Sequence, residues 1–166
     1  MNIFFPSLFF SLILVCQSGC DIGWVLRVAN PYLCSFLQTV TNDTKEAIAQ
    51  IYTAAVNLTK EELNNKLNEW AAKQGGELEE GLRKYLAEEA DYWNRRYETL
   101  MRRITESNAT AEAKRELIDI VNFEQDMDIK FNEYEAKLNA IQSKYNKDVE
   151  EEAKKIWDAI DTPEVR

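Results

Sequence analysis

The sequence NLTKEELNNKLNEWAAKQGG at residues 57–76 predicts a helix with both of its ends marked. Thr59 and Glu62 have the spacing of a capping box, in which each side chain bonds the backbone N–H group of the other residue. Gly75 and Gly76 predict the end of the helix, because glycine adopts the left-handed backbone conformation there without a steric penalty. This block therefore defines one complete helix from local signals alone.

Apolar side chains at helical spacing continue along the rest of the chain. Trp70 lies on the apolar face of the first helix, and a long helix is predicted over residues 77–105. The apolar residues between 86 and 104 alternate steps of four and three, as in the seam of a helical bundle. A further helix, entered around Asp126, repeats this alternation over residues 127–145, so we expect the two seams to pack antiparallel. The sequence predicts an all-α protein, a compact bundle of about six helices with one long central helix.

The composition excludes several classes of function. The 166-residue chain is 45% hydrophobic and 30% charged, which is typical of a folded globular protein. Its formal net charge of −9 disfavours binding to nucleic acid or to anionic lipid. The chain has no histidine, so the Ser–His–Asp and Cys–His catalytic arrangements are impossible, and no glycine-rich phosphate loop is present. We therefore expect a protein that is not an enzyme and has no nucleic-acid partner.

Residues 1–18 predict a secretory signal peptide. Their apolar run is interrupted by Pro6 and is too short to span a bilayer comfortably, and small residues follow it. Cleavage after Ser18 would leave Cys20 and Cys34, which could form one disulfide, whereas cleavage after Cys20 would leave Cys34 alone. Both alternatives stay open. We expect a secreted, extracellular protein without a membrane span once the leader is removed.

Three N-glycosylation sequons support export, with acceptors at Asn42, Asn57 and Asn108. Each acceptor falls between predicted helices, where a glycan would be tolerated. A single sequon arises easily by chance in a chain rich in asparagine, but three behind a leader favour export. The chain after the leader is predicted to form an N-terminal segment with a short helix, a helical domain and a C-terminal tail, over residues 19–41, 42–161 and 162–166.

A group of carboxylates between two predicted helices suggests a weak, partly hydrated site for Mg²⁺ or Ca²⁺. Hard cations prefer oxygen ligands on a loop that can wrap around them. The candidate ligands are Asp119, Glu124, Asp126 and Asp128. The stretch is not an EF-hand, because Phe131 stands where that loop requires glycine. The spacing alone favours the alternative that Asp126 or Asp128 only caps the next helix.

Aromatic residues at helical spacing allow a different function, a carrier for a small apolar, lipid-like ligand. Such a stripe is more often plain core. The residues concerned are Trp70, Trp93, Tyr97, Phe131, Tyr134 and Trp157. A structural protein that associates with itself through the two predicted seams is a third alternative.

Residues 57–76 resemble the SXP/RAL family of nematode secreted antigens, which includes an Anisakis allergen. In that family a Leu-Thr cap opens a helix with two leucines and a tryptophan, which ends at glycine and leads into a long charged helix. Residues 31–33 are also similar to the start of the family's mature chains, and residues 110–114 to the cap after its long helix. The sequons and the pair Cys20 and Cys34 are not features associated with the family.

The resemblance implies a small, all-helical, secreted parasite protein without enzymatic activity that the host meets as an antigen. Its implied partners are a divalent cation and host proteins or antibodies, because the family's domain is described as cation-binding. No ligand motif of the family can be carried over to individual residues of this sequence. The four candidate carboxylates therefore rest on their spacing alone.

Overall fold

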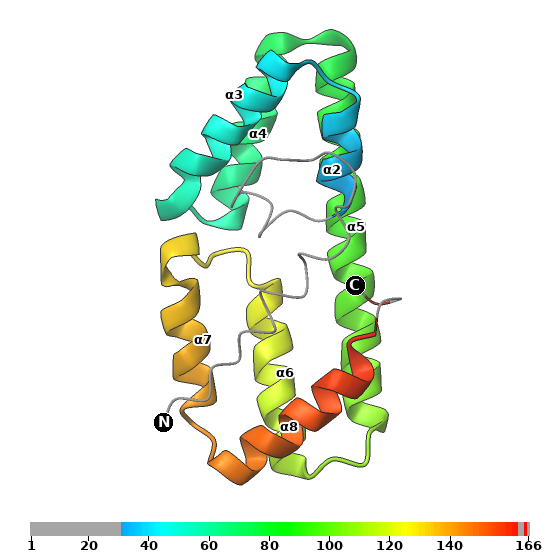
Figure 1. Ribbon diagram of the computed structural model, residues 1–166, viewed down its shortest axis with the longest axis vertical. Coiled ribbons are helices and arrows are strands. Elements are labelled where there is room, and N and C mark those ends of the chain that lie inside the picture. The colour runs from blue at the N-terminus through cyan, green and yellow to red at the C-terminus, as the bar shows by residue number, and fades with distance from the viewer. Residues whose placement is uncertain (1–30, 163–164, 166) are drawn as a thin grey trace. The chain divides into compact units, whose positions relative to one another are not determined.

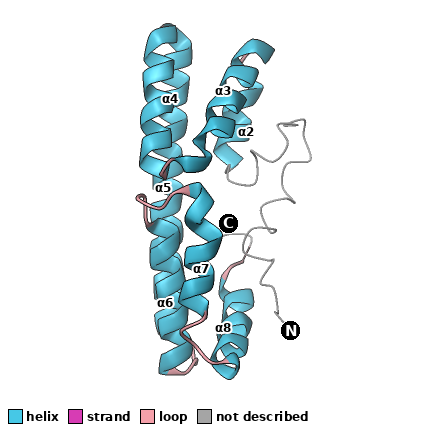
Figure 2. Ribbon diagram, turned by 90° about the vertical axis from the view of Figure 1, so that its left-hand side faces the viewer, coloured by secondary structure: helices cyan, strands magenta, loops and turns pink. Residues whose placement is uncertain are grey.

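The computed structural model describes residues 31–162 and residue 165 (Figure 1). The predicted signal peptide and Cys20 lie outside the described residues, and with them the predicted disulfide. The described residues form seven α-helices, two short 3₁₀-helices and no strand, which confirms the all-α prediction. Figure 2 shows these helices joined by loops. Over the same residues, no helix has both the length and the apolar character needed to cross a membrane.

The chain divides into two units, which are described separately. Unit 1 comprises Met1–Val56 and Glu62–Glu89, and unit 2 comprises Asn57–Glu61 and Ala90–Arg166. The helices are α2 (Pro31–Gln38), α3 (Asn42–Ala54), η3 (Ala55–Asn57), α4 (Lys60–Gln74), α5 (Gly76–Glu106), α6 (Ala111–Gln125), η4 (Phe131–Glu133), α7 (Tyr134–Gln142) and α8 (Lys147–Ile160). The predicted long helix is confirmed as the 31-residue α5, which contributes residues to both units.

The double-glycine stop in unit 1 is confirmed. Gly75 and Gly76 have φ angles of 69° and 56°, so the chain passes from α4 to α5 through the left-handed region. A Cβ atom added at either glycine would meet nothing within 4 Å, so the backbone conformation alone requires glycine here. The core of unit 1 consists of buried side chains from α2 to α5, among them Leu33, Leu37, Ile48, Leu67, Leu82 and Tyr85.

In unit 2, α6 packs against both α7 and α8. Thr110 caps α6 as predicted, because its side chain accepts a hydrogen bond from the N–H group of Ala113. Asn146 caps α8, because its side chain accepts from the N–H groups of Asp148 and Val149. The core of unit 2 includes the buried side chains of Leu100, Ile104, Leu117, Ile120, Val121, Val149, Ala153 and Trp157.

The predicted helix over residues 127–145 is wrong at its start. Residues 126–130 form a loop, and only the 3₁₀-helix η4 and the nine-residue helix α7 follow. Met127, the first member of the predicted seam, is 41% exposed. Tyr134 of α7 packs against Phe123 of α6, with ring centroids 4.6 Å apart, so α7 has its partner in α6. The described residues therefore replace the predicted pairing of two long seams by a pairing of α6 with α7.

Candidate functional site

The four candidate metal ligands do not form one group. Asp119 lies on α6, where it accepts a hydrogen bond from the Tyr145 hydroxyl at 2.8 Å. Glu124, near the end of α6, lies beside the Arg96 guanidinium. Asp126 and Asp128 are joined by a hydrogen bond in the exposed loop after α6. No three Asp, Glu or Cys side chains of the described residues are placed to hold one metal ion.

Asp126 and Asp128 stabilise a turn. A side-chain oxygen of Asp126 accepts from the backbone N–H group of Asp128 at 2.9 Å, and Asp126 is itself the C-terminal cap residue of α6. The next helical turn begins after Lys130, without a side-chain cap. Neither aspartate therefore caps a following helix, which corrects the alternative that the sequence favoured. Both carboxylates are exposed and lie in a short loop.

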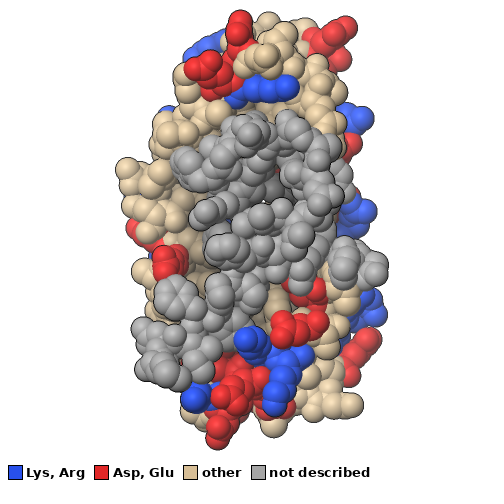
Figure 3. Space-filling model, in the orientation of Figure 1, with Lys and Arg blue, Asp and Glu red and all other residues tan. Residues whose placement is uncertain are grey.

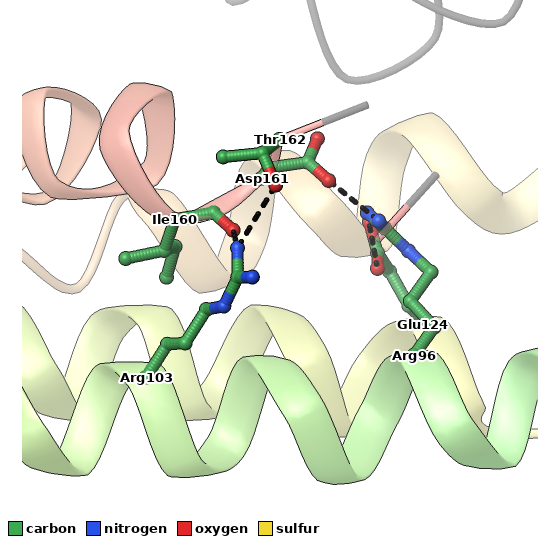
Figure 4. Close-up of polar contacts among 6 residues, drawn as sticks. All are labelled: Arg96, Arg103, Glu124, Ile160, Asp161 and Thr162. Atoms are coloured by element: carbon green, nitrogen blue, oxygen red, sulfur yellow. Dashed lines mark hydrogen bonds and ion pairs between the residues drawn. The ribbon is translucent and has the colours of Figure 1, made fainter. Parts of the chain in front are cut away.

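Unit 2 contains a buried ion pair that the sequence did not suggest. Arg96 on α5 bonds Asp161, the cap residue after α8, at 2.5 Å, and the two side chains are 9% and 6% exposed (Figure 4). Glu124 lies 3.9 Å from the same guanidinium, which also lies over the ring of Trp157. Burial raises the pKa of Glu124, and the charge of Arg96 opposes this effect.

A second arginine of α5 holds the same end of α8. Arg103 donates from one nitrogen to the carbonyl oxygen of Ile160 at 2.6 Å and to the hydroxyl of Thr162 at 3.0 Å (Figure 4). In the sequence both arginines are only charged residues of the predicted long helix over residues 77–105, and nothing nearby indicates their partners. The structure instead uses them to fix the last turn of α8. The only signal in the sequence was an acidic residue, Asp161, directly after the last predicted helix. Its partner Arg96 is 65 residues away and could not be inferred from local spacing.

The start of α4 is attached to the loop after α6 within unit 2. The Lys60 ammonium donates to the carbonyl oxygen of Glu124 at 2.5 Å and lies 5.7 Å from the centre of the Trp93 ring. Thr59, the predicted cap, forms an isolated antiparallel bridge with Lys130. These contacts join residues that are far apart in the sequence. The conformation of the loop after α6 is therefore stabilised by residues 59 and 60.

Unit 1 has a buried polar group of a different kind. The hydroxyls of Tyr52 and Tyr85 are 3.2 Å apart, and that of Tyr85 donates to Glu89 at 3.0 Å. Phe36 stacks on Tyr85, with ring centroids 6.1 Å apart. Burial raises the pKa of both phenols, so they stay neutral over the whole physiological range. The arrangement is a packing and hydrogen-bonding device of the core.

The aromatic side chains of the predicted stripe have individual packing roles. Trp157 is buried beside Arg96, and the hydroxyl of Tyr97 donates to Asn122 at 3.0 Å. Trp70, on α4, is half-buried. The hypothesis of a carrier for an apolar ligand stays a prediction.

The three glycan acceptors are accessible. Asn42 is the first residue of α3, and Asn108 lies in the loop between α5 and α6; both are exposed. Asn57 is also exposed, and its side-chain oxygen Oδ1 accepts from the side-chain amide of Asn132 at 2.8 Å. The nitrogen that would carry a glycan is therefore not the atom used in this contact.

These features define a small helical protein in which a buried ion pair joins α5 to the residue that follows α8. The chain matches, over residues 1–106, the family described as SXP/RAL-2 family protein Ani s 5-like, metal-binding domain. It belongs to this family, which confirms the resemblance found in residues 57–76. None of the curated proteins compared with the chain matches it, and no solved structure does.

The matched family is described as metal-binding, but the described residues contain no group of three possible ligands placed around one ion. The four predicted ligands lie after residue 106, outside the matched range. Inside it, acidic residues of α5 form ion pairs with basic residues one turn away, for example Glu79 with Arg83 at 2.5 Å and Asp91 with Arg95 at 3.0 Å. Any cation bound by the described residues would therefore rely on few carboxylates and much water, as Mg²⁺ commonly does.

Proposed function

We propose that the protein is a secreted, non-enzymatic member of the SXP/RAL-2 family that binds Mg²⁺ or Ca²⁺ weakly and acts through contacts with host proteins or antibodies. The match over residues 1–106 to a domain described as metal-binding carries this proposal. The absence of a three-carboxylate group among the described residues is the reason for expecting weak binding.

Within the described residues, the turn at Asp126 and Asp128 is the best place for a hydrated cation. Both side chains are exposed, and only one carboxylate oxygen of the pair is used in the turn itself. Two carboxylates on a short loop, with water completing the coordination, are a usual way for Mg²⁺ to bind. The family match leaves residues 1–106 as the competing location.

Titration of Mg²⁺ and Ca²⁺ into the metal-free protein, followed by calorimetry and by backbone amide NMR, tests both parts. We expect dissociation constants of about a millimolar, with the largest shifts at residues 126–128. A D126N/D128N variant should then bind more weakly, whereas the matched control E135Q/D158N loses two exposed carboxylates elsewhere and should bind as the parent protein does. Shifts confined to residues before 107 would move the site into the matched region, and an absence of heat and shifts at millimolar ion would refute the cation proposal.

Secretion has its own support, the predicted leader and the three accessible sequons. Expression of the full chain in a eukaryotic secretory system should give a glycosylated protein in the medium. Treatment with an N-glycosidase should reduce its mass, and the variants N42Q, N57Q and N108Q should each remove one glycan. Retention of the full chain inside the cell without a glycan would contradict this part of the proposal and leave the cation test unaffected.

A further inference from the structure

Glu116 is the most unusual titratable residue of unit 2. It lies on α6 between core residues, with a relative exposure of 0%, and neither of its carboxylate oxygens has a hydrogen-bond partner. It forms no ion pair with any lysine or arginine of the described chain. A carboxylate that is ionised in such a place loses its hydration without compensation, which is strongly unfavourable.

The groups that face Glu116 make its ionised form still less favourable. Glu150, on α8, is a second negative charge close enough to repel it. Tyr145, between α7 and α8, has a pKa raised to about 12, chiefly by burial and by its hydrogen bond to Asp119, with Glu116 contributing. Burial and the charge of Glu150 together raise the pKa of Glu116 to about 7.

We propose that Glu116 is a proton-binding site built into the contact between α6 and α8, whose neutral form allows these helices to pack and whose ionised form loosens them. The position of the residue carries this inference, because α6 packs closely on α8 and Glu116 is fully buried on α6 beside the acidic Glu150. This device is independent of the proposed cation binding.

The direction of the effect follows from linkage. The pKa of Glu116 is about 7 in the folded protein and lies near its ordinary value of 4.5 in the unfolded chain. The folded state therefore binds the extra proton between these two pH values. The stability that the neutral group supports is fully present below the unfolded pKa, falls as the pH rises, and is lost above about pH 7.

Urea unfolding of the parent protein and of E116Q, across a pH series, measures this effect. Glutamine keeps the shape of the protonated carboxyl but cannot ionise. From about pH 5 to about pH 8 we expect the folding constant of the parent protein to fall relative to that of E116Q on the order of 100-fold. E112Q, which removes an exposed carboxylate from the same helix, should follow the parent protein. E150Q removes the charge that helps to raise the pKa of Glu116, so its loss should be smaller and complete at a lower pH than in the parent protein. Parallel pH profiles for the parent and E116Q would overturn the proposal.

A direct titration does not depend on a variant that folds. The side-chain carboxyl carbon of Glu116, observed by ¹³C NMR in the parent protein, should titrate well above the exposed glutamates. A midpoint within their range would overturn the proposal. A third test measures how Mg²⁺ or Ca²⁺, added at about pH 8, changes the stability of the parent protein and of E116Q. Stabilisation of the parent protein but not of E116Q would assign the carboxyl to a metal and overturn the proton-binding role, and equal effects on both proteins would support it.

Discussion

The two units solve the problem of buried polarity differently. In unit 1 the buried polar atoms of Tyr52 and Tyr85 are neutral phenols in contact with each other. In unit 2, Arg96 and Asp161 are opposite charges that compensate each other at 2.5 Å. Removal of the Tyr52 hydroxyl leaves an uncharged phenol behind, whereas removal of the Arg96 guanidinium leaves the Asp161 carboxylate buried without that cation. The two cores should therefore respond very differently to equivalent changes.

The largest expected effect is at the ion pair of unit 2. Replacement of Arg96 by alanine would leave Asp161 buried without its cation and should lower the free energy of unfolding by about 3–5 kcal/mol, measured by urea unfolding. The neighbouring Arg95 pairs with Asp91 on the surface, and its replacement by alanine should cost less than about 1 kcal/mol. Similar losses for both variants would show that the buried pair has no special role.

The neutral pair of unit 1 should be less sensitive. Tyr85→Phe removes the hydroxyl that contacts both Tyr52 and Glu89, and should lower the free energy of unfolding by about 1–2 kcal/mol. Its loss should not vary between about pH 5 and about pH 8, because burial raises the pKa of both phenols far beyond this range. A loss as large as that of the Arg96 variant would remove the contrast between the two cores.

The connections between helices also differ between the two units. The connection between α4 and α5 depends on backbone conformation, and the one between α5 and α6 depends on side-chain hydrogen bonds. Gly75→Ala places a Cβ atom at a φ of 69° and should lower the free energy of unfolding by about 1 kcal/mol. Gly75→Asn should cost less, because asparagine tolerates the left-handed region better than alanine. Thermal unfolding of both variants checks this order, and equal losses would contradict the backbone explanation.

The smallest effect is expected where Thr110, between α5 and α6, bonds Glu152 of α8. Glu152 accepts from both the N–H group and the hydroxyl of Thr110, and these hydrogen bonds, the hydroxyl first, lower its pKa. The stability that these bonds provide is present above the ordinary pKa of the carboxyl and is lost as the pH falls through the lowered value. In a ¹³C titration, Thr110→Val should return the midpoint of Glu152 toward that of an ordinary exposed glutamate. An unchanged midpoint would show that Thr110 does not cause the shift.

Local signals predicted the elements that depend on neighbouring residues. The stop at Gly75, the extent of α5 and the cap at Thr110 are each determined within one or two turns. The loop over residues 126–130 was missed because its apolar spacing continues a helical pattern. Its conformation depends on distant backbone partners, with the N–H group of Phe131 bonded to the carbonyl oxygen of Leu58 at 3.1 Å.

The candidate site shows the same division. Carboxylates that are close in the sequence were taken as close in space, but Asp119 and Glu124 are engaged by Tyr145 and Arg96. Helical periodicity could place Arg96 on a face of α5 but could not show that Asp161 would meet it there. Burial of Glu116 was equally hidden, because a glutamate on a charged helix is normally solvated.

The anchoring of residues 160–162 matters for immunological reagents. Ile160 and Asp161 are buried, and the backbone of Ile160 and the hydroxyl of Thr162 are held by Arg103. Antibodies raised against a free peptide centred on residues 160–162 would therefore find the side chains of Ile160 and Asp161 inaccessible in the native protein. Sera that recognise the folded molecule should contain few antibodies against that peptide.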